Sequence, residues 1–200
     1  EDIEVDFQLP DTFDVSVPWL PAPGAEATAY RVGPTPAAWP ARTAIGRLGG
    51  RQTLAVGGAR LRLAVLGDVP EATAARWLTE AAGAVASLYG AFPLPSPQVL
   101  VMPADSAAEA VPWAQIVRGG GAAALFFVDP TRPLRDLRDD WTATHEFSHL
   151  LIPYVARDEA WLSEGLASYY QNVLRARAGM LDERTAWERL EAGFRRGRAE

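Results

Sequence analysis

The chain has 200 residues, of which 48% are hydrophobic and 22% are charged. This composition is typical of a folded protein with one large or two small domains, and it excludes an intrinsically disordered chain. The sequence has no cysteine and no apolar run approaching ~18 residues, which excludes a disulfide framework and a membrane span in this chain. The net charge of −6 argues against nucleic acid as a partner.

The N-terminal part of the chain is expected to be β-rich or irregular. Ile3, Val5 and Phe7 alternate with polar residues, which predicts a half-buried strand. Six prolines between residues 18 and 40 argue against a helix or a central strand and predict a loop or linker. Apolar runs at 52–56 and 60–66, separated by two glycines, predict a β-hairpin. We therefore treat residues 1–70 as one region.

The pattern changes at Glu71, and residues 71–200 are expected to form a second unit. Helical spacing of apolar residues, together with Gly and Pro at the ends of the segments, separates predicted helices from predicted strands. Helices are predicted at 71–90, 136–152 and 161–178 and from Asp182 onward, and strands at 99–102 and 122–128.

The two histidines of the chain, His145 and His149, lie four residues apart in a predicted helix, with Glu146 directly after the first. Residues at this spacing share one helix face, so both imidazoles can bind one metal ion at ~2.0–2.1 Å. Glu146 is placed to act as general base on a metal-activated water. The alternative is a pair of structural histidines that bind no metal.

A third protein ligand has to be a carboxylate, because the chain has neither cysteine nor another histidine. Two histidines and one carboxylate leave the fourth position of zinc open to water, as in catalytic sites. We favour Glu164, in the first turns of the next predicted helix, where the small Gly165 and Ala167 would allow close packing. Glu159 is the second choice, as a loop ligand or as the hydrogen-bond partner of an imidazole. The carboxylates considered are Asp158, Glu159, Glu164, Asp182 and Glu183.

The segments 145–149 (HEFSH) and 161–170 (WLSEGLASYY) resemble the gluzincin metallopeptidases of the thermolysin-like clan, and most closely their alanyl and glycyl aminopeptidase branches. The resemblance covers residues 71–200 and implies an α+β catalytic domain, in which a small mixed sheet precedes a helical half that carries HExxH. It implies Zn²⁺ at His145, His149 and Glu164, Glu146 as catalytic base, and a peptide or protein as substrate. Fourteen residues separate His149 from Glu164, which indicates a compact, short-spaced form.

Two features of the aminopeptidase branches have no clear counterpart here. Residues 118–125 lack the acid that in those branches holds the substrate's free amine, which favours an endopeptidase and leaves the choice between exo- and endopeptidase open. This segment could still be an edge strand that pairs with an extended peptide. For the oxyanion-stabilising residue, Tyr169 and Tyr170 are the candidates, with Tyr154 also considered, and the donor could instead lie beyond Glu200.

The sequence therefore predicts a zinc-dependent peptidase that hydrolyses peptide bonds through a metal-activated water. The alternative is a peptidase-like metal-binding module that binds peptides without cleaving them. A start without Met, basic residues that are all Arg, and the lack of Cys favour an extracytoplasmic bacterial location, periplasmic or secreted.

Overall fold

The computed structural model describes residues 3–24, 28–36, 38–48, 51–106 and 108–198, so the charged residues Glu1, Asp2, Glu26 and Glu200 lie outside the described part of the chain. The strands are β1 (Ile3–Asp6), β2 (Asp14–Ser16), β3 (Leu20–Pro21), β4 (Ala29–Val32), β5 (Ala44–Gly46), β6 (Gln52–Val56), β7 (Ala59–Val65), β8 (Gln98–Pro103), β9 (Trp113–Val117) and β10 (Ala123–Val128). The helices are α1 (Glu71–Ala86), α2 (Leu134–Asp139), α3 (Thr142–Ser148), α4 (Ala160–Arg177) and α5 (Glu183–Gly197), with 3₁₀ turns η1 (His149–Leu151) and η2 (Arg157–Glu159).

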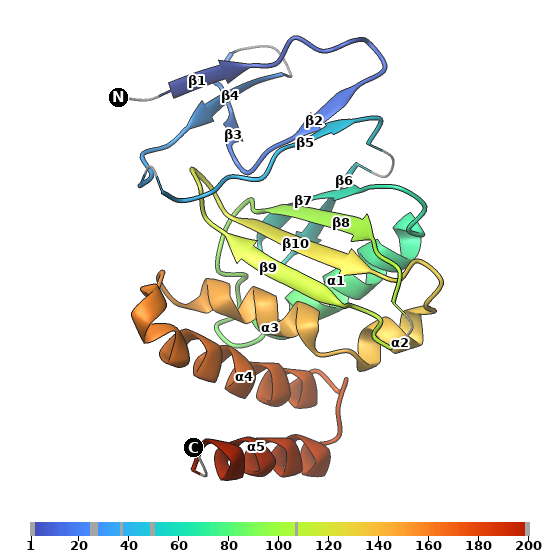
Figure 1. Ribbon diagram of the computed structural model, residues 1–200, viewed down its shortest axis with the longest axis vertical. Coiled ribbons are helices and arrows are strands. Elements are labelled where there is room, and N and C mark those ends of the chain that lie inside the picture. Colours follow the sequence, from blue (N-terminus) through green and yellow to red (C-terminus); the bar gives the residue numbers. More distant parts are fainter. Residues whose placement is uncertain (1–2, 25–27, 37, 49–50, 107, 199–200) are drawn as a thin grey trace.

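A five-stranded mixed sheet forms the centre of the molecule, in the order β6-β7-β8-β10-β9. β7 and β10 both pair parallel with β8, whereas β6 and β9 add antiparallel strands at the two edges. The architecture is α+β with a helical C-terminal half, as expected (Figure 1). β9 leaves one row of backbone groups without a neighbouring strand of this sheet.

The central strands are apolar on both sides because both faces of the sheet are covered. Val99 and Val101 of β8 join the core beneath α1 and α3, while Leu100 between them joins a cluster on the opposite face with Ala44 and Leu48. Successive side chains of a strand point to opposite faces, so this alternation follows from the strand geometry.

The C-terminal helices lie in succession below the sheet, with α3 next to β9 and β10, α4 against α3, and α5 against α4 (Figure 1). Edge-to-face aromatic contacts connect these layers. Trp77 of α1 meets Phe126 of β10 at a centroid distance of 5.3 Å, and Phe126 meets Phe147 of α3 at 5.6 Å. Phe147 is fully buried, so it anchors the segment that carries both histidines.

The predicted hairpin, the first helix, the two strands at 99–102 and 122–128, and the last two helices are confirmed. The prediction for residues 18–40 is wrong in part. β4, at Ala29–Val32, is the central strand of a three-stranded sheet of order β1-β4-β3. Pro23 and Pro34 lie outside β4, so every residue of this strand keeps its N–H.

The single helix predicted at 136–152 is also wrong, because the segment divides into α2, α3 and η1. Asp140 has an extended backbone with ψ of 141°, which ends α2. Its Oδ1 accepts the N–H of Thr142 at 2.7 Å, satisfying one of the free donors where α3 begins. His149 follows α3 as the first residue of η1.

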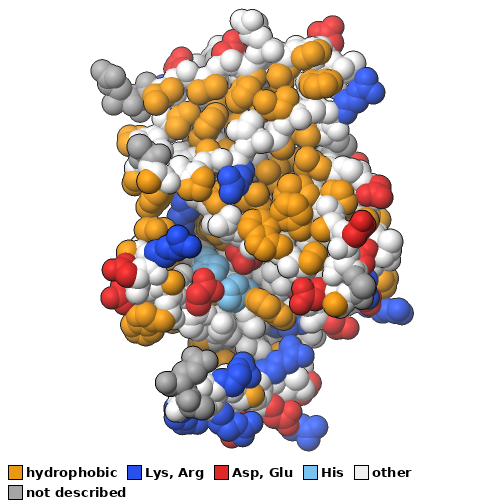
Figure 2. All heavy atoms as spheres, viewed as in Figure 1, with side chains coloured by type: hydrophobic (Ala, Val, Ile, Leu, Met, Phe, Trp, Pro, Cys, Tyr) orange, Lys and Arg blue, Asp and Glu red, His pale blue; other side chains and the backbone are white. Residues whose placement is uncertain are grey.

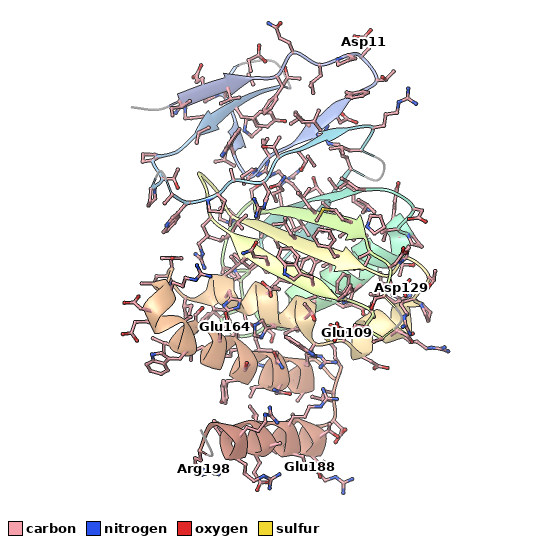
Figure 3. The ribbon with its side chains drawn as sticks, in the orientation of Figure 1. Asp11, Glu109, Asp129, Glu164, Glu188 and Arg198 are labelled. Carbon is pink, nitrogen blue, oxygen red and sulfur yellow. The ribbon has the colours of Figure 1, made fainter. Side chains whose placement is uncertain are left out.

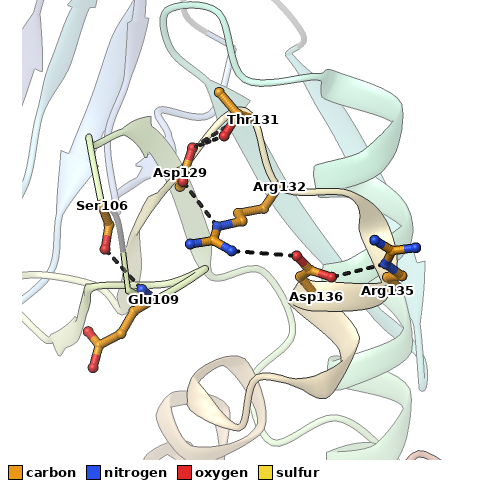
Figure 4. A network of polar contacts seen from close by, with 7 residues as sticks. All are labelled: Ser106, Glu109, Asp129, Thr131, Arg132, Arg135 and Asp136. Atoms are coloured by element: carbon orange, nitrogen blue, oxygen red, sulfur yellow. Dashed lines mark hydrogen bonds and ion pairs between the residues drawn. The ribbon is translucent and has the colours of Figure 1, made fainter.

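A polar network fixes the turn that leads from β10 to α2 (Figure 4). Asp129 Oδ1 accepts the N–H of Thr131 at 2.9 Å and its hydroxyl at 2.6 Å, and Oδ2 accepts Nε of Arg132 at 3.1 Å. These hydrogen bonds hold the pKa of Asp129 below its usual value. The carboxylate is therefore fully engaged in shaping the turn.

The predicted division between residues 1–70 and 71–200 stays a prediction. The pairing of β7 with β8 places residues 59–65 in the same sheet as the strands that follow α1. Among the described residues, no helix combines the length and the apolar character needed to cross a membrane.

Candidate active site

The two histidines lie at the C-terminal end of α3 and the start of η1, on the side that faces α4. The His145 and His149 rings are 4.8 Å apart and nearly perpendicular, and their Nε2 atoms are separated by 3.2 Å. His145 is buried and also meets the ring of Trp141 edge-on at 5.1 Å. The spacing of four residues thus places the two Nε2 atoms next to each other, even though the α-helix ends between His145 and His149.

Glu164 of α4 completes the cluster, at the place where α4 packs on α3 (Figure 3). Its Oε2 lies 3.2 Å from Nε2 of His145, and its Oε1 lies 3.6 Å from Nε2 of His149. Ala167 is buried in the packing of α4, as expected. Gly165 does not serve close packing, because a Cβ built on it would meet nothing within 4 Å.

The three side chains fit a zinc ion. Ligands held tetrahedrally at ~2.05 Å are separated from one another by about 3.3 Å, and the three separations here are 3.2, 3.2 and 3.6 Å. Among the described residues, these three form a group of potential metal ligands whose ligand atoms all lie within 4.8 Å of one another. Two imidazole nitrogens and one carboxylate are also a donor set typical of zinc with one open position.

Hydrogen bonds to the other ring nitrogens orient both imidazoles. Nδ1 of His145 donates to Oε1 of Gln171 at 2.7 Å, and Nδ1 of His149 shares a hydrogen bond with Oγ of Ser163 at 2.9 Å. With the proton on Nδ1, each Nε2 keeps its lone pair directed toward the other ligands. Glu159, the predicted partner of an imidazole, instead accepts Nε1 of Trp161 at 2.7 Å and is exposed.

Glu146 has an environment suited to holding a proton. Burial raises its pKa to about 7, with a further contribution from the negative charge of Glu164, while a hydrogen bond from the N–H of Ile116 opposes the shift. Burial and the neighbouring His145 lower the pKa of His149, which keeps its imidazole neutral and able to bind a metal.

Glu146, His149 and Glu164 line a groove of 590 Å³ between β9, the η1–η2 loop and α4. Figure 2 shows the two histidines, in pale blue, in a recess with acidic and basic side chains beside them. The remaining lining residues are Pro40, Ala114, Gln115, Ile116, Arg118, Pro153, Tyr154, Val155, Arg157, Ala160 and Ser163.

The tyrosine candidates do not share one location. Tyr169 lines a different hollow, between α4 and α5, together with Trp141. Tyr170 packs on the main core and hydrogen-bonds Tyr89, contacts that raise its pKa. Tyr154 lines the groove, where its ring lies 4.6 Å from that of Trp39.

The sequence-based prediction of an edge strand at residues 118–125 is wrong. Residues 118–125 are not an edge strand: β10 lies inside the sheet between β8 and β9, and the glycines before it form a turn. The edge strand is β9, and its residues Ala114, Gln115 and Ile116 line the groove.

Arg118, Gln171 and Ser163 are contacts that sequence reasoning did not assign to this site. Nη2 of Arg118 donates to the carbonyl oxygens of His149 at 2.7 Å and Ile152 at 3.1 Å, so it holds the end of the histidine segment against the turn after β9. Ser163 precedes Glu164, and Gln171 lies seven residues, about two helical turns, after it. The seven-residue spacing was the signal that could have placed Gln171 on the helix face of Glu164, whereas no such spacing applies to Ser163.

A family model described as M61 glycyl aminopeptidase matches residues 151–199. Among solved structures, an aminopeptidase N family protein from Idiomarina loihiensis matches with a TM-score of 0.66 at 16% identity, over 92% of this chain and 35% of that one. An M1 zinc metallopeptidase from Deinococcus radiodurans matches with a TM-score of 0.50 at 18% identity, over 90% of this chain and 41% of that one. No curated protein gave a match.

These similarities confirm the resemblance to a gluzincin-type metallopeptidase domain near the aminopeptidase branches. The fold is that of the thermolysin-like aminopeptidase domains, and at these identities the structural likeness shows the fold alone. The chain spans about a third of the length of the first of the two structures.

Proposed function

We propose that this chain is a zinc-dependent peptidase domain in which His145, His149 and Glu164 hold the metal and Glu146 is the catalytic base. The observation that carries the proposal is the convergence of two imidazole Nε2 atoms and one carboxylate, at separations of 3.2 to 3.6 Å, inside a groove that also contains Glu146. The family similarities described above support the same class of reaction.

The substrate is an extended peptide. β9 is an edge strand beside Glu146, and the backbone groups of its open edge other than the Ile116 N–H, which bonds Glu146, can pair with a peptide as an added strand. Such pairing fixes the peptide by its main chain and places a backbone carbonyl next to the histidine cluster. Specificity then comes from the side chains along the groove.

When bound, a zinc ion supplies Lewis-acid chemistry that polarises a carbonyl and lowers the pKa of water. Glu146 accepts the proton of the attacking water on its carboxylate and delivers it to the leaving amine. Burial makes this carboxylate a stronger base than an exposed one, which favours its taking up a proton. Of the three tyrosines considered, Tyr154 is the one in the groove, which makes its phenol the candidate donor to the oxyanion.

The test is the variant Glu146→Gln, which keeps the size of the side chain and removes its basicity. We expect kcat for peptide hydrolysis to fall by a factor on the order of 10²–10⁴, while elemental analysis still finds about one zinc per chain. Glu159→Gln is the matched control, because Glu159 is exposed and bonds Trp161, and it should retain full activity. Unchanged hydrolysis by zinc-loaded Glu146→Gln would show that another group is the base.

A further inference from the structure

The charged residues of the groove differ in what they already contact. Its described lining contains two carboxylates, Glu146 and Glu164, and two arginines, Arg118 and Arg157. Both carboxylates have roles in the proposed reaction. Neither arginine forms an ion pair with a described residue.

Arg118 is a half-buried cation whose contacts are neutral. Its Nη2 donates to two backbone carbonyls, those of His149 and Ile152, and its Nε and Nη1 bond no described residue. Burial lowers its pKa, as expected for a cation that is removed from water without a nearby anion. Three N–H donors on two nitrogens of this guanidinium, Nε and Nη1, are therefore left for a group that enters the groove.

Arg157 begins η2, and residues 152–156 connect it to η1. Its side chain is exposed, lines the same groove, and has no hydrogen bond or ion pair with a described residue. Nothing in the described structure holds this side chain away from the groove. Arg118 thus contacts the start of the 152–156 loop, at Ile152, and Arg157 directly follows the end of this loop.

We propose that Arg118 and Arg157 form an anion subsite that selects peptides carrying a carboxylate, an inference that rests on the proposed peptidase function. The planar guanidinium group donates two parallel hydrogen bonds that match a carboxylate. Two chemical sources supply that group: an Asp or Glu side chain of the substrate, or its C-terminal carboxylate.

The same arrangement disfavours an ammonium group at this end of the groove. An α-amine would meet two like charges, and both carboxylates of the described lining would already be engaged. A bound divalent cation would add to the positive potential and draw anions further. The groove therefore selects for an acidic group and not for a free N-terminus.

Binding to the zinc-loaded Glu146→Gln protein tests this inference without turnover. Two pairs of hexapeptides are titrated by calorimetry, each pair differing in one group. In the first pair both ends are blocked and one side chain is Glu or Gln. In the second pair the side chains are neutral, the N-terminus is acetylated, and the C-terminus is free or amidated.

We expect the carboxylate member of at least one pair to bind about tenfold more tightly than its neutral counterpart, and the pair that responds identifies the source. Adding Arg157→Gln should remove the preference. Arg184→Gln is the matched control on α5, with a side chain that is 86% exposed and outside the groove, and it should leave the preference intact. Both variants replace exposed residues, so the fold is not at risk.

Affinities within twofold in both pairs, no measurable binding of the carboxylate peptides, or a preference that survives Arg157→Gln would each overturn the subsite. Hydrolysis of the same peptides by the unsubstituted protein separates this result from the proposed function. Preferential binding without any cleavage would sustain the subsite and refute the peptidase. Equal binding of neutral and acidic peptides followed by cleavage of both would refute the subsite and sustain the peptidase.

Discussion

Three glutamates near the histidine pair differ only in their surroundings. Glu146 is half-buried against β9, Glu164 is exposed on one side and faces both imidazoles on the other, and Glu159 is exposed and bonds an indole. Burial favours the protonated form of a carboxyl group, whereas nearby metal ligands favour coordination. Position in the fold therefore supports the proposed proton-transfer role of Glu146 and the proposed ligand role of Glu164.

The raised pKa of Glu146 predicts how the stability of the metal-free protein depends on pH. Its pKa is about 7 when folded and near 4.5 when unfolded, so between these values the folded state binds a proton that the unfolded state has lost. The free energy of unfolding therefore falls as pH rises through this window, by on the order of 3 kcal/mol. Glu146→Gln removes this contribution to the pH dependence of stability.

Urea denaturation in the presence of a chelator measures this effect. Relative to the unsubstituted protein, Glu146→Gln should gain stability between about pH 4.5 and pH 7.5, because glutamine carries no charge to bury. Glu159→Gln should show no such gain, since Glu159 is exposed. A stability difference for Glu146→Gln that is the same at both pH values would contradict the buried environment assigned to this carboxyl group.

Much of the site follows from sequence spacing, and the remainder depends on tertiary packing. The four-residue separation of the histidines and the WLSEG segment pointed to residues that the structure brings together. The hydrogen bonds of Gln171, Ser163 and Arg118 depend on how α4 and the turn after β9 meet α3, which no local pattern encodes. Tyr169 and Tyr170 are adjacent in sequence, yet the helix turns both away from the groove.

At the scale of elements, hydrophobic periodicity did not reveal two features, one in the helical half and one in the central sheet. The apolar spacing of residues 136–152 continues across Asp140, so it predicts one helix, whereas Asp140 is extended and its side chain bonds the N–H of Thr142, where a new helix begins. β9 is short and only partly buried, so its apolar alternation is weak. Long, strongly periodic segments such as α1 and α4 were predictable because their burial pattern repeats over several turns.

The glycine turn between β9 and β10 is an element that admits a direct test. A Cβ on Gly121 would lie 2.1 Å from the carbonyl oxygen of Pro18, so backbone has to move. We expect Gly121→Ala to lower the free energy of unfolding by about 1–3 kcal/mol. Gly83→Ala in α1, where a Cβ meets nothing within 4 Å, should raise it by about 0.5–1 kcal/mol.

Chemical denaturation of both glycine variants gives the comparison under identical conditions. The account of this turn requires opposite signs, because Gly121 packs against the N-terminal region and Gly83 is a helical position with open space. Stabilisation by Gly121→Ala would mean that the turn does not pack against Pro18 in solution.

At the scale of the whole molecule, the hydrophobic clusters indicate which parts can fold alone. Leu61, Leu63 and Val65 of β7 belong to the main core with α1 and the central strands. Val15, Val17 and Tyr30 form a separate cluster in the N-terminal region. Residues 52–65 therefore belong structurally with the sheet that follows them.

Two shortened chains test this arrangement. A chain of residues 71–200 lacks β6 and β7 and exposes the edge of β8, and the lost core residues at ~1.5–3 kcal/mol each would exceed the stability of a typical domain. We expect it not to unfold cooperatively. A chain of residues 38–200 keeps the five-stranded sheet and the cover provided by Ala44 and Leu48, and it should show a single cooperative transition.

Circular dichroism during thermal denaturation distinguishes these outcomes. Cooperative unfolding of residues 71–200 alone would support the division at residue 70 and would show that β6 and β7 are dispensable. Loss of cooperativity in residues 38–200 would show instead that the sheets of β1 to β4 are required for the main core.

The central claim is that His145, His149 and Glu164 hold one metal ion. Anomalous diffraction at the zinc absorption edge, from crystals of the zinc-loaded protein, tests it most directly. We expect one strong peak at ~2.0–2.2 Å from Nε2 of both histidines and from a carboxylate oxygen of Glu164. Zinc-loaded crystals with no peak between these three side chains, or with the side chains turned apart, would contradict the account.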